Sequence, residues 1–102
     1  MELTGKCKED FEKWRKKQNY NVDAPYFYEL KYSMQYGVYV DFFDSVGIEI
    51  EITKWDEDTW QCLVSNKKTL IADELYDMYS RLEARTAAIT KANEIYNGNE
   101  HK

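Results

Sequence analysis

The stretch "SMQYGVYVDFFDSVGIEIEI", Ser33 to Ile52, decides the fold because its apolar residues change period at a single glycine. Before Gly47 the apolar side chains recur at helical spacing, on one stripe made by Met34, Val38, Phe42 and Val46. After Gly47 the pattern alternates strictly, with isoleucine at 48, 50 and 52 and polar residues between. A helix followed directly by a half-buried strand is therefore predicted.

The first half of this stretch also fits a strand. Counted by twos, its apolar face would hold Tyr32, Met34, Tyr36, Val38, Val40 and Phe42. Two features favour the helix: Ser33 is a good N-cap, and Gly47 stands where a left-handed helix terminator belongs. Gly37 opposes the helix by about 1 kcal/mol relative to alanine. A small residue at this position suits the close approach of another element.

Upstream, the sequence predicts a further helix. Leu3, Cys7, Phe11 and Trp14 fall on one helical stripe, with Thr4 as N-cap and acidic residues preceding basic ones, the order that the helix dipole favours. Asn19–Pro25 is predicted to break this helix, because the residue before proline resists helical geometry. The segment Tyr26–Tyr32 is expected to be a loop or a brief extended piece.

The residues after Gly47 predict an antiparallel hairpin. Ile48, Ile50 and Ile52 face one way, while Glu49, Glu51 and Thr53 face the other. The turn is placed at residues 55–59, and the partner strand continues through Trp60, Cys62 and Val64. The turn is longer than two residues, so the strand register stays open.

From Thr69 onward the pattern is interpreted as helical, with one stripe formed by Ile71, Leu75, Met78 and Leu82. Ser80 and Glu83 match the Ser-x-x-Glu capping box, so a new helix is predicted to start at Arg81. The predicted fold is a single α+β domain over residues 1–102, ordered α-α-β-β-α, with helices packed on a small antiparallel hairpin or sheet. Residues 1–3 and 98–102 are expected to be frayed.

Length and composition limit the class of protein. The chain has 102 residues, 43% of them hydrophobic, which suits one domain with a modest core. No apolar run follows a basic N-terminus and no eighteen apolar residues run together, so a cytoplasmic protein without a membrane segment is expected. Cys7 and Cys62 stand far apart without a CxxC motif and are interpreted as buried free thiols.

Little in the sequence indicates catalysis. Asp41 and Asp44 are three residues apart on the predicted helix, so they can be a divalent-ion pair or an acid and base pair, but no further ligand accompanies them. They are interpreted as surface charges. The single histidine, His101, lies at the chain end, and no glycine-rich phosphate loop is present. The prediction is therefore a protein that is not an enzyme and carries no cofactor or metal.

The charge distribution indicates a binding surface. The net charge is −5, but residues 21–60 hold nine acidic residues against two basic ones. The acidic side chains of the predicted hairpin, together with one tryptophan, are Glu49, Glu51, Asp56, Glu57, Asp58 and Trp55. Such charges either protect a sheet edge from aggregation or imitate nucleic-acid phosphates toward a basic groove. A host protein with a basic surface is the predicted partner.

A basic segment supports an alternative. The chain carries Lys13, Arg15, Lys16 and Lys17 around Trp14, with Tyr20 available for stacking on a base. The simpler interpretation is a solvated helix end that complements its own dipole. A single-stranded nucleic-acid-binding protein is therefore the alternative function, ahead of a small enzyme of unknown class.

Two stretches carry a resemblance: residues 33–52, quoted above, and "EARTAAITKANEIYN", residues 83–97. They resemble segments of small uncharacterised proteins of phages and mobile elements of Bacteroidetes-like bacteria, over about a third of the chain. The resemblance implies no activity and no site residue. It does imply a setting in which small acidic proteins inhibit host defence, as anti-CRISPR proteins do. The predicted function is thus non-enzymatic binding and inhibition of a nucleic-acid-handling host protein, in an oligomeric state that the sequence leaves open.

Overall fold

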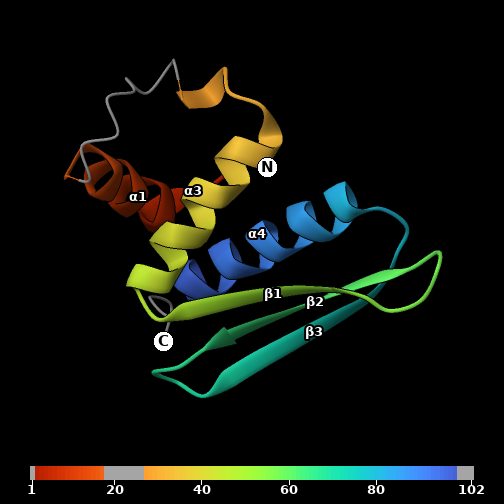
Figure 1. Cartoon of the computed structure of the whole chain (residues 1–102). Helices are drawn as coiled ribbons and strands as arrows, with labels where there is room; N and C mark the ends of the chain where they lie inside the picture. Colours follow the sequence, from red (N-terminus) through yellow and green to blue (C-terminus); the bar gives the residue numbers. More distant parts are fainter. Residues whose placement is uncertain (1, 18–26, 99–102) are drawn as a thin grey trace.

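The computed structural model describes residues 2–17 and 27–98. Along the chain the elements are α1 (Gly5–Lys17), α3 (Tyr32–Ser45), β1 (Ile48–Lys54), β2 (Trp60–Asn66), β3 (Ile71–Met78) and α4 (Arg81–Gly98) (Figure 1). The α+β class is confirmed, and the order α-α-β-β-β-α contains one strand more than predicted. The predicted break at Asn19–Pro25 lies outside the described residues, and the chain is helical at residues 27 and 28 rather than extended.

The elements are arranged in layers. The three strands form an antiparallel sheet in the order β1-β2-β3. Helices α3 and α4 cover one face of the sheet, and α1 packs on these two helices on the side away from the sheet (Figure 1). The other face of the sheet carries no helix (Figure 1). The sheet is thus half-buried, as the alternation of isoleucine and polar residues in β1 predicts.

The change of structure at Gly47 is confirmed. Helix α3 ends at Ser45, and the N–H of Gly47 donates to the carbonyl of Asp44 at 3.2 Å. Gly47 has a φ of +87°, a conformation that glycine adopts without steric cost. The helix begins before the predicted cap, since Lys31 is the N-cap residue and makes no side-chain capping bond, so the Ser33 cap is wrong. The close approach expected at Gly37 is also wrong, because a Cβ there would meet nothing within 4 Å.

The helix predicted from Thr69 is wrong over residues 71–78, which form β3. The cause is a β-bulge. Cys62 pairs with Leu75 and Trp60 pairs with Met78, so two residues of β2 span the same distance as three of β3. Asp77 lies in this bulge with a φ of +63°. Leu75 and Met78 therefore face the core at a spacing of three, which imitates a helical stripe.

Beyond β3, the predicted helix start is confirmed. Helix α4 begins at Arg81, the hydroxyl of Ser80 accepts a hydrogen bond from the N–H of Glu83 at 3.1 Å, and the Glu83 carboxylate accepts from the N–H of Tyr79 at 3.0 Å. These reciprocal bonds satisfy two backbone donors at the helix start, which is the role of a capping box. Within residues 69–98, therefore, α4 is helical and a single long helix from Thr69 is not formed.

Helix α1 begins after Thr4, as predicted, but α4 provides its cap. The Asn93 carboxamide accepts the N–H of Thr4 at 2.9 Å and donates to its hydroxyl at 3.0 Å. The Asn97 carboxamide accepts the N–H of Cys7 at 2.9 Å and donates to the carbonyl of Thr4 at 2.8 Å. These bonds fix the start of α1, and Leu3, expected to be frayed, is instead buried in the core.

We predict that Gly47→Ala destabilises the protein by about 1 kcal/mol or more, because alanine is strained at positive φ. The new Cβ would lie 3.7 Å from the nearest Lys68 atoms, so the backbone and not a clash sets the cost. Gly37→Ala is the matched control, in an exposed helical position without neighbours, and should stabilise the protein by about 0.5–1 kcal/mol. Urea unfolding midpoints that move in the same direction for both variants would contradict this assignment.

We predict that Asn93→Ala lowers the free energy of unfolding by about 1–2 kcal/mol, because it removes the Asn93 part of the α1 cap and leaves the partly buried N–H of Thr4 without its acceptor. Glu94→Ala, on the next position of α4, removes only an exposed pair with Lys91 and should change stability by less than about 0.5 kcal/mol. Chemical unfolding followed by circular dichroism compares the two. Equal losses would show that the asparagine bonds do not hold α1.

Candidate functional site

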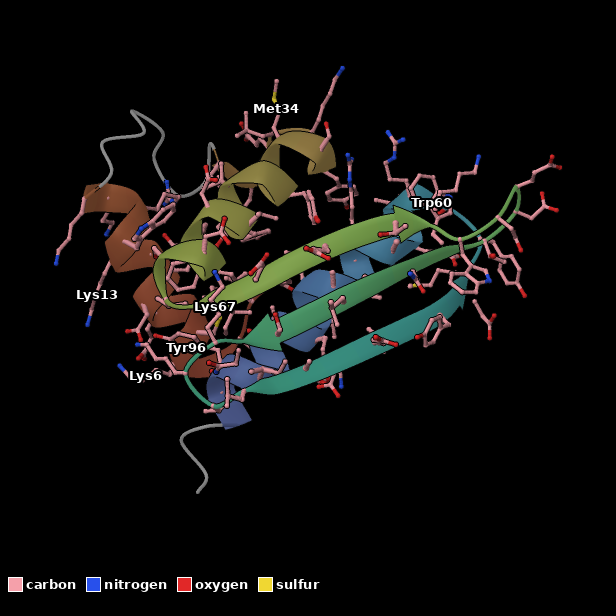
Figure 2. All side chains as sticks on the ribbon, turned by 60° about the horizontal axis from the view of Figure 1, so that its bottom comes forward. Lys6, Lys13, Met34, Trp60, Lys67 and Tyr96 are labelled. Carbon is pink, nitrogen blue, oxygen red and sulfur yellow. The ribbon has the colours of Figure 1, made fainter. Side chains whose placement is uncertain are left out.

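The open face of the sheet gathers acidic side chains from the two outer strands, β1 and β3. The strand register places Glu51, Leu63 and Glu74 in one cross-strand row, and Glu49, Ser65 and Ala72 in the next. Figure 2 looks onto this face, with the helices behind the sheet. We call the acidic surface formed by Glu49, Glu51 and Glu74 the acidic face. Glu49 and Glu51 were predicted here, whereas Glu74 was missed because its segment was assigned to a helix.

The three carboxylates differ in their neighbours. Glu49 pairs with Lys67 at 3.2 Å, and both side chains are exposed, so water and salt screen this pair. Glu51 and Glu74 have no basic side chain within ion-pair distance among residues 2–17 and 27–98. The negative charge at the centre of the acidic face is therefore left uncompensated.

An exposed aromatic pair lies at one end of the acidic face. The ring of Trp55, 65% exposed, meets the ring of Tyr76 edge-on with centroids 6.2 Å apart. The Tyr76 hydroxyl donates to the Glu74 carboxylate, and this hydrogen bond raises the pKa of Tyr76. Trp55 was among the predicted site residues and Tyr76 was not, although the alternation of Ala72, Glu74 and Tyr76 was a readable signal. Exposed aromatic rings beside charge are typical of interface anchors.

In the turn between β1 and β2, the predicted site residue Asp56 forms hydrogen bonds within the turn itself. The Asp56 carboxylate accepts the N–H groups of Asp58 and Thr59 and the hydroxyl of Thr59, each at 2.9 Å. These hydrogen bonds lower the pKa of Asp56 and hold the turn in shape. Glu57 and Asp58 are exposed at the tip. Asp56 thus positions the tip, while Glu57 and Asp58 extend the charge of the acidic face toward solvent.

The basic segment is divided by the fold. Arg15 is only 2% exposed, pairs with Glu12 at 2.7 Å, and lies 5.3 Å from the centre of the Phe27 ring. Lys13, Lys16 and Lys17 are exposed on α1, and Tyr20 lies outside the described residues. Arg15 is on the same stripe as Phe11, four residues earlier, and packs inward with it. The segment therefore does not present Arg15 to a nucleic acid.

No arrangement for metal or covalent chemistry is apparent among the described residues. Asp41 and Asp44 are both exposed on α3, and no cluster of three His, Cys, Asp or Glu side chains suited to a metal ion occurs in residues 2–17 and 27–98. His101 lies outside those ranges. Among the described helices, none has the length and apolar character needed to cross a lipid bilayer.

Comparisons with known proteins assign no function to the acidic face. The chain matches no protein-family model, no curated protein and no solved structure. The geometry of the described residues is therefore the basis on which a function is argued. Among these residues, the acidic face is where the predicted Glu49 and Glu51 of β1 lie on the same open face as Glu74 of β3, which was not predicted.

Burial makes both thiols unreactive. Cys7 and Cys62 are buried, and burial raises the pKa of Cys7 to about 12 and that of Cys62 above its usual value. At pH 8 a thiol with a pKa of about 12 is ionised in only about one molecule in 10⁴. The thiolate is the reacting form, so a cysteine nucleophile is disfavoured at either position.

We predict that a chromogenic aromatic disulfide labels both cysteines slowly in the folded protein and rapidly in urea. Each thiol reacts only after the core opens transiently. The labelling rate should therefore rise with pH, because a larger fraction of the exposed thiol is then in the thiolate form. Absorbance of the released thiolate measures both rates. Labelling of either thiol in native buffer as fast as in urea would contradict the buried assignment.

Proposed function

We propose that this protein is a non-enzymatic binding protein that engages a basic protein surface through the acidic face. The observation that carries the proposal is the row of Glu51, Leu63 and Glu74, which places two unpaired carboxylates on either side of an apolar side chain. Complementary charge steers association, and a desolvated apolar centre supplies affinity. The carboxylates and the apolar side chain lie together on one surface of the sheet.

The rigidity of the surface supports recognition rather than simple solubility. Adjacent strands lie about 4.8 Å apart, so the backbones bearing Glu51 and Glu74 are separated by about 10 Å across β2. The sheet fixes this spacing, and the hydrogen bond from Tyr76 orients the Glu74 carboxylate. An ordered array of charges loses less conformational entropy on binding than a flexible acidic tail.

The aromatic end favours a protein partner. Trp55 and Tyr76 offer large contact areas with few rotatable bonds, beside carboxylates that repel nucleic-acid phosphates. A basic surface that ordinarily receives phosphates is a suitable counterpart, so the proposed partner is a protein that handles nucleic acid. The resemblance to proteins of phages and mobile elements supports the further proposal that binding inhibits a host defence protein, as anti-CRISPR proteins do.

The test is a comparative pull-down from a host lysate, with and without nuclease. The variant Glu51→Lys/Glu74→Lys reverses the acidic face, and Asp41→Lys/Asp44→Lys makes the same change in net charge on α3. We predict that proteins captured by the wild type are lost with the first variant and kept with the second, whether or not nuclease is added. For the purified partner, the association rate should fall about tenfold or more at low salt with the first variant.

Two outcomes would contradict the proposal. Equal capture by both variants would show that the acidic face is not the contact surface. Micromolar binding of labelled single-stranded RNA or DNA, abolished by replacing Lys13, Lys16 and Lys17 with glutamine, would support the nucleic-acid alternative instead. Circular dichroism and thermal melting of each variant establish that the fold is retained before either result is interpreted.

A further inference from the structure

A cluster of cations and aromatic rings lies where the sheet meets the start of α4, on the face opposite to the acidic face. The guanidinium of Arg81 lies 5.0 Å from the centre of the Trp60 ring, and that of Arg85 lies 5.1 Å from the centre of the Tyr36 ring. The Lys54 ammonium lies 5.9 Å from the same Trp60 ring. Trp60 is labelled at this end of the sheet in Figure 2. Three cations from α4 and β1 thus gather around rings from β2 and α3.

Among the residues that the structure describes, none of these cations forms an ion pair with a carboxylate, although Lys54 attracts the Asp56 carboxylate and contributes to its lowered pKa. The ion pairs among residues 2–17 and 27–98 involve the cations Lys6, Arg15, Lys67 and Lys91. Arg81, Arg85 and Lys54 take part in none of them, although the chain holds 19 acidic residues against 14 basic ones. Carboxylates are therefore abundant in the protein, but none in residues 2–17 and 27–98 lies within ion-pair distance of these three cations.

The position of Arg81 also opposes helix stability. Arg81 is the first residue of α4, where the positive end of the helix dipole disfavours a cation, whereas Arg85, about one turn further, lies largely beyond this effect. The two guanidinium groups and the lysine repel one another as well. Contacts with the aromatic rings offset part of this cost. A bound anion would remove the remainder.

The geometry around the cluster suits a small anion. Tyr36, Ile52, Trp60, Arg81 and Arg85 line a cavity of about 290 Å³. A guanidinium that stacks on a ring keeps its N–H edge available for two parallel hydrogen bonds to one oxyanion.

We propose that this cavity is a binding site for a phosphomonoester. The two arginine forks that line the cavity match a phosphate that carries close to two negative charges and three terminal oxygens better than they match a single carboxylate. Lys54 lies outside the lining, near the Trp60 ring, and adds to the positive charge around the site. The volume accommodates the phosphate with part of the group that bears it. The site lies on the helix-covered side of the sheet and is independent of the proposed partner surface.

The test is an NMR titration of the wild type in low-salt buffer free of phosphate, with inorganic phosphate, adenosine 5′-monophosphate and adenosine as probes. We expect saturable shifts of the Trp60 indole N–H and the Arg81 and Arg85 side-chain N–H signals with both phosphates. Adenosine should produce none. Absence of saturation, shifts centred elsewhere, or equal binding of adenosine would overturn the proposal.

Variants then separate this site from general charge attraction. Arg81→Gln/Arg85→Gln should weaken binding of adenosine 5′-monophosphate by about tenfold or more, and Arg81→Lys/Arg85→Lys should also weaken it because lysine lacks the planar fork. The control Lys8→Gln/Lys68→Gln removes the same charge from two exposed positions outside the cluster and outside the basic segment of α1, and it should change affinity less than about twofold. Equal losses in the glutamine pair and the control would overturn the site. If thermal melting shows that the arginine variants are not folded at the titration temperature, the chemical-shift changes of the wild type alone test the site.

Competition identifies the source of the phosphate. Displacement of adenosine 5′-monophosphate by a 5′-phosphorylated oligonucleotide, but not by its 5′-hydroxyl counterpart, supports the site with a strand end as ligand. Displacement by neither supports the site with a free small molecule as ligand. Equal displacement by both would show recognition of the diester backbone and would overturn the monoester assignment.

Discussion

The fold depends on the packing around one ring, that of Phe11. Its centroid lies 4.9 Å from that of Tyr39 and 5.4 Å from those of both Phe27 and Phe42. Burial of one such side chain stabilises by about 1.5–3 kcal/mol, and each aromatic pair adds about 0.5–1.5 kcal/mol. Through these contacts α1 is attached to α3 and to the segment at residue 27. Phe42 continues the cluster to Tyr96 of α4, with centroids 5.9 Å apart, so the helical layers share one aromatic core.

Local patterns predicted those elements that are stabilised locally. The period change at Gly47 and the capping box at Ser80 and Glu83 both act within a few residues, and both predictions were confirmed. The third strand escaped prediction because the bulge at Asp77 spaces Leu75 and Met78 as a helix would. A bulge depends on pairing with β2, and such a partner cannot be read from β3 alone.

The same distinction applies to the sites. Glu49, Glu51 and Trp55 could be predicted because they belong to one hairpin with a clear alternation. Glu74 and Tyr76 join them only through the third strand, and the cavity between Arg81 and Arg85 is completed by rings from α3 and β2. The error at Arg15 was the opposite one, because a buried residue was predicted to bind a ligand. It belongs to a run of basic residues, but it lies four positions after Phe11 on the same helical stripe and therefore packs inward. Charge composition locates a region, but the fold determines which charges a ligand can meet.

The asparagine cap of α1 has a consequence for how the chain acquires its structure. Its hydrogen bonds join residues separated by 89 to 93 positions, so they close a loop of nearly the whole sequence. During synthesis α1 emerges first, yet its cap must wait for α4 to leave the ribosome. Contacts of such long sequence separation slow folding, because the entropy of loop closure is lost before they form. A nascent chain that stalls before Asn93 therefore leaves the start of α1 open, to be captured by a chaperone or cut by a protease.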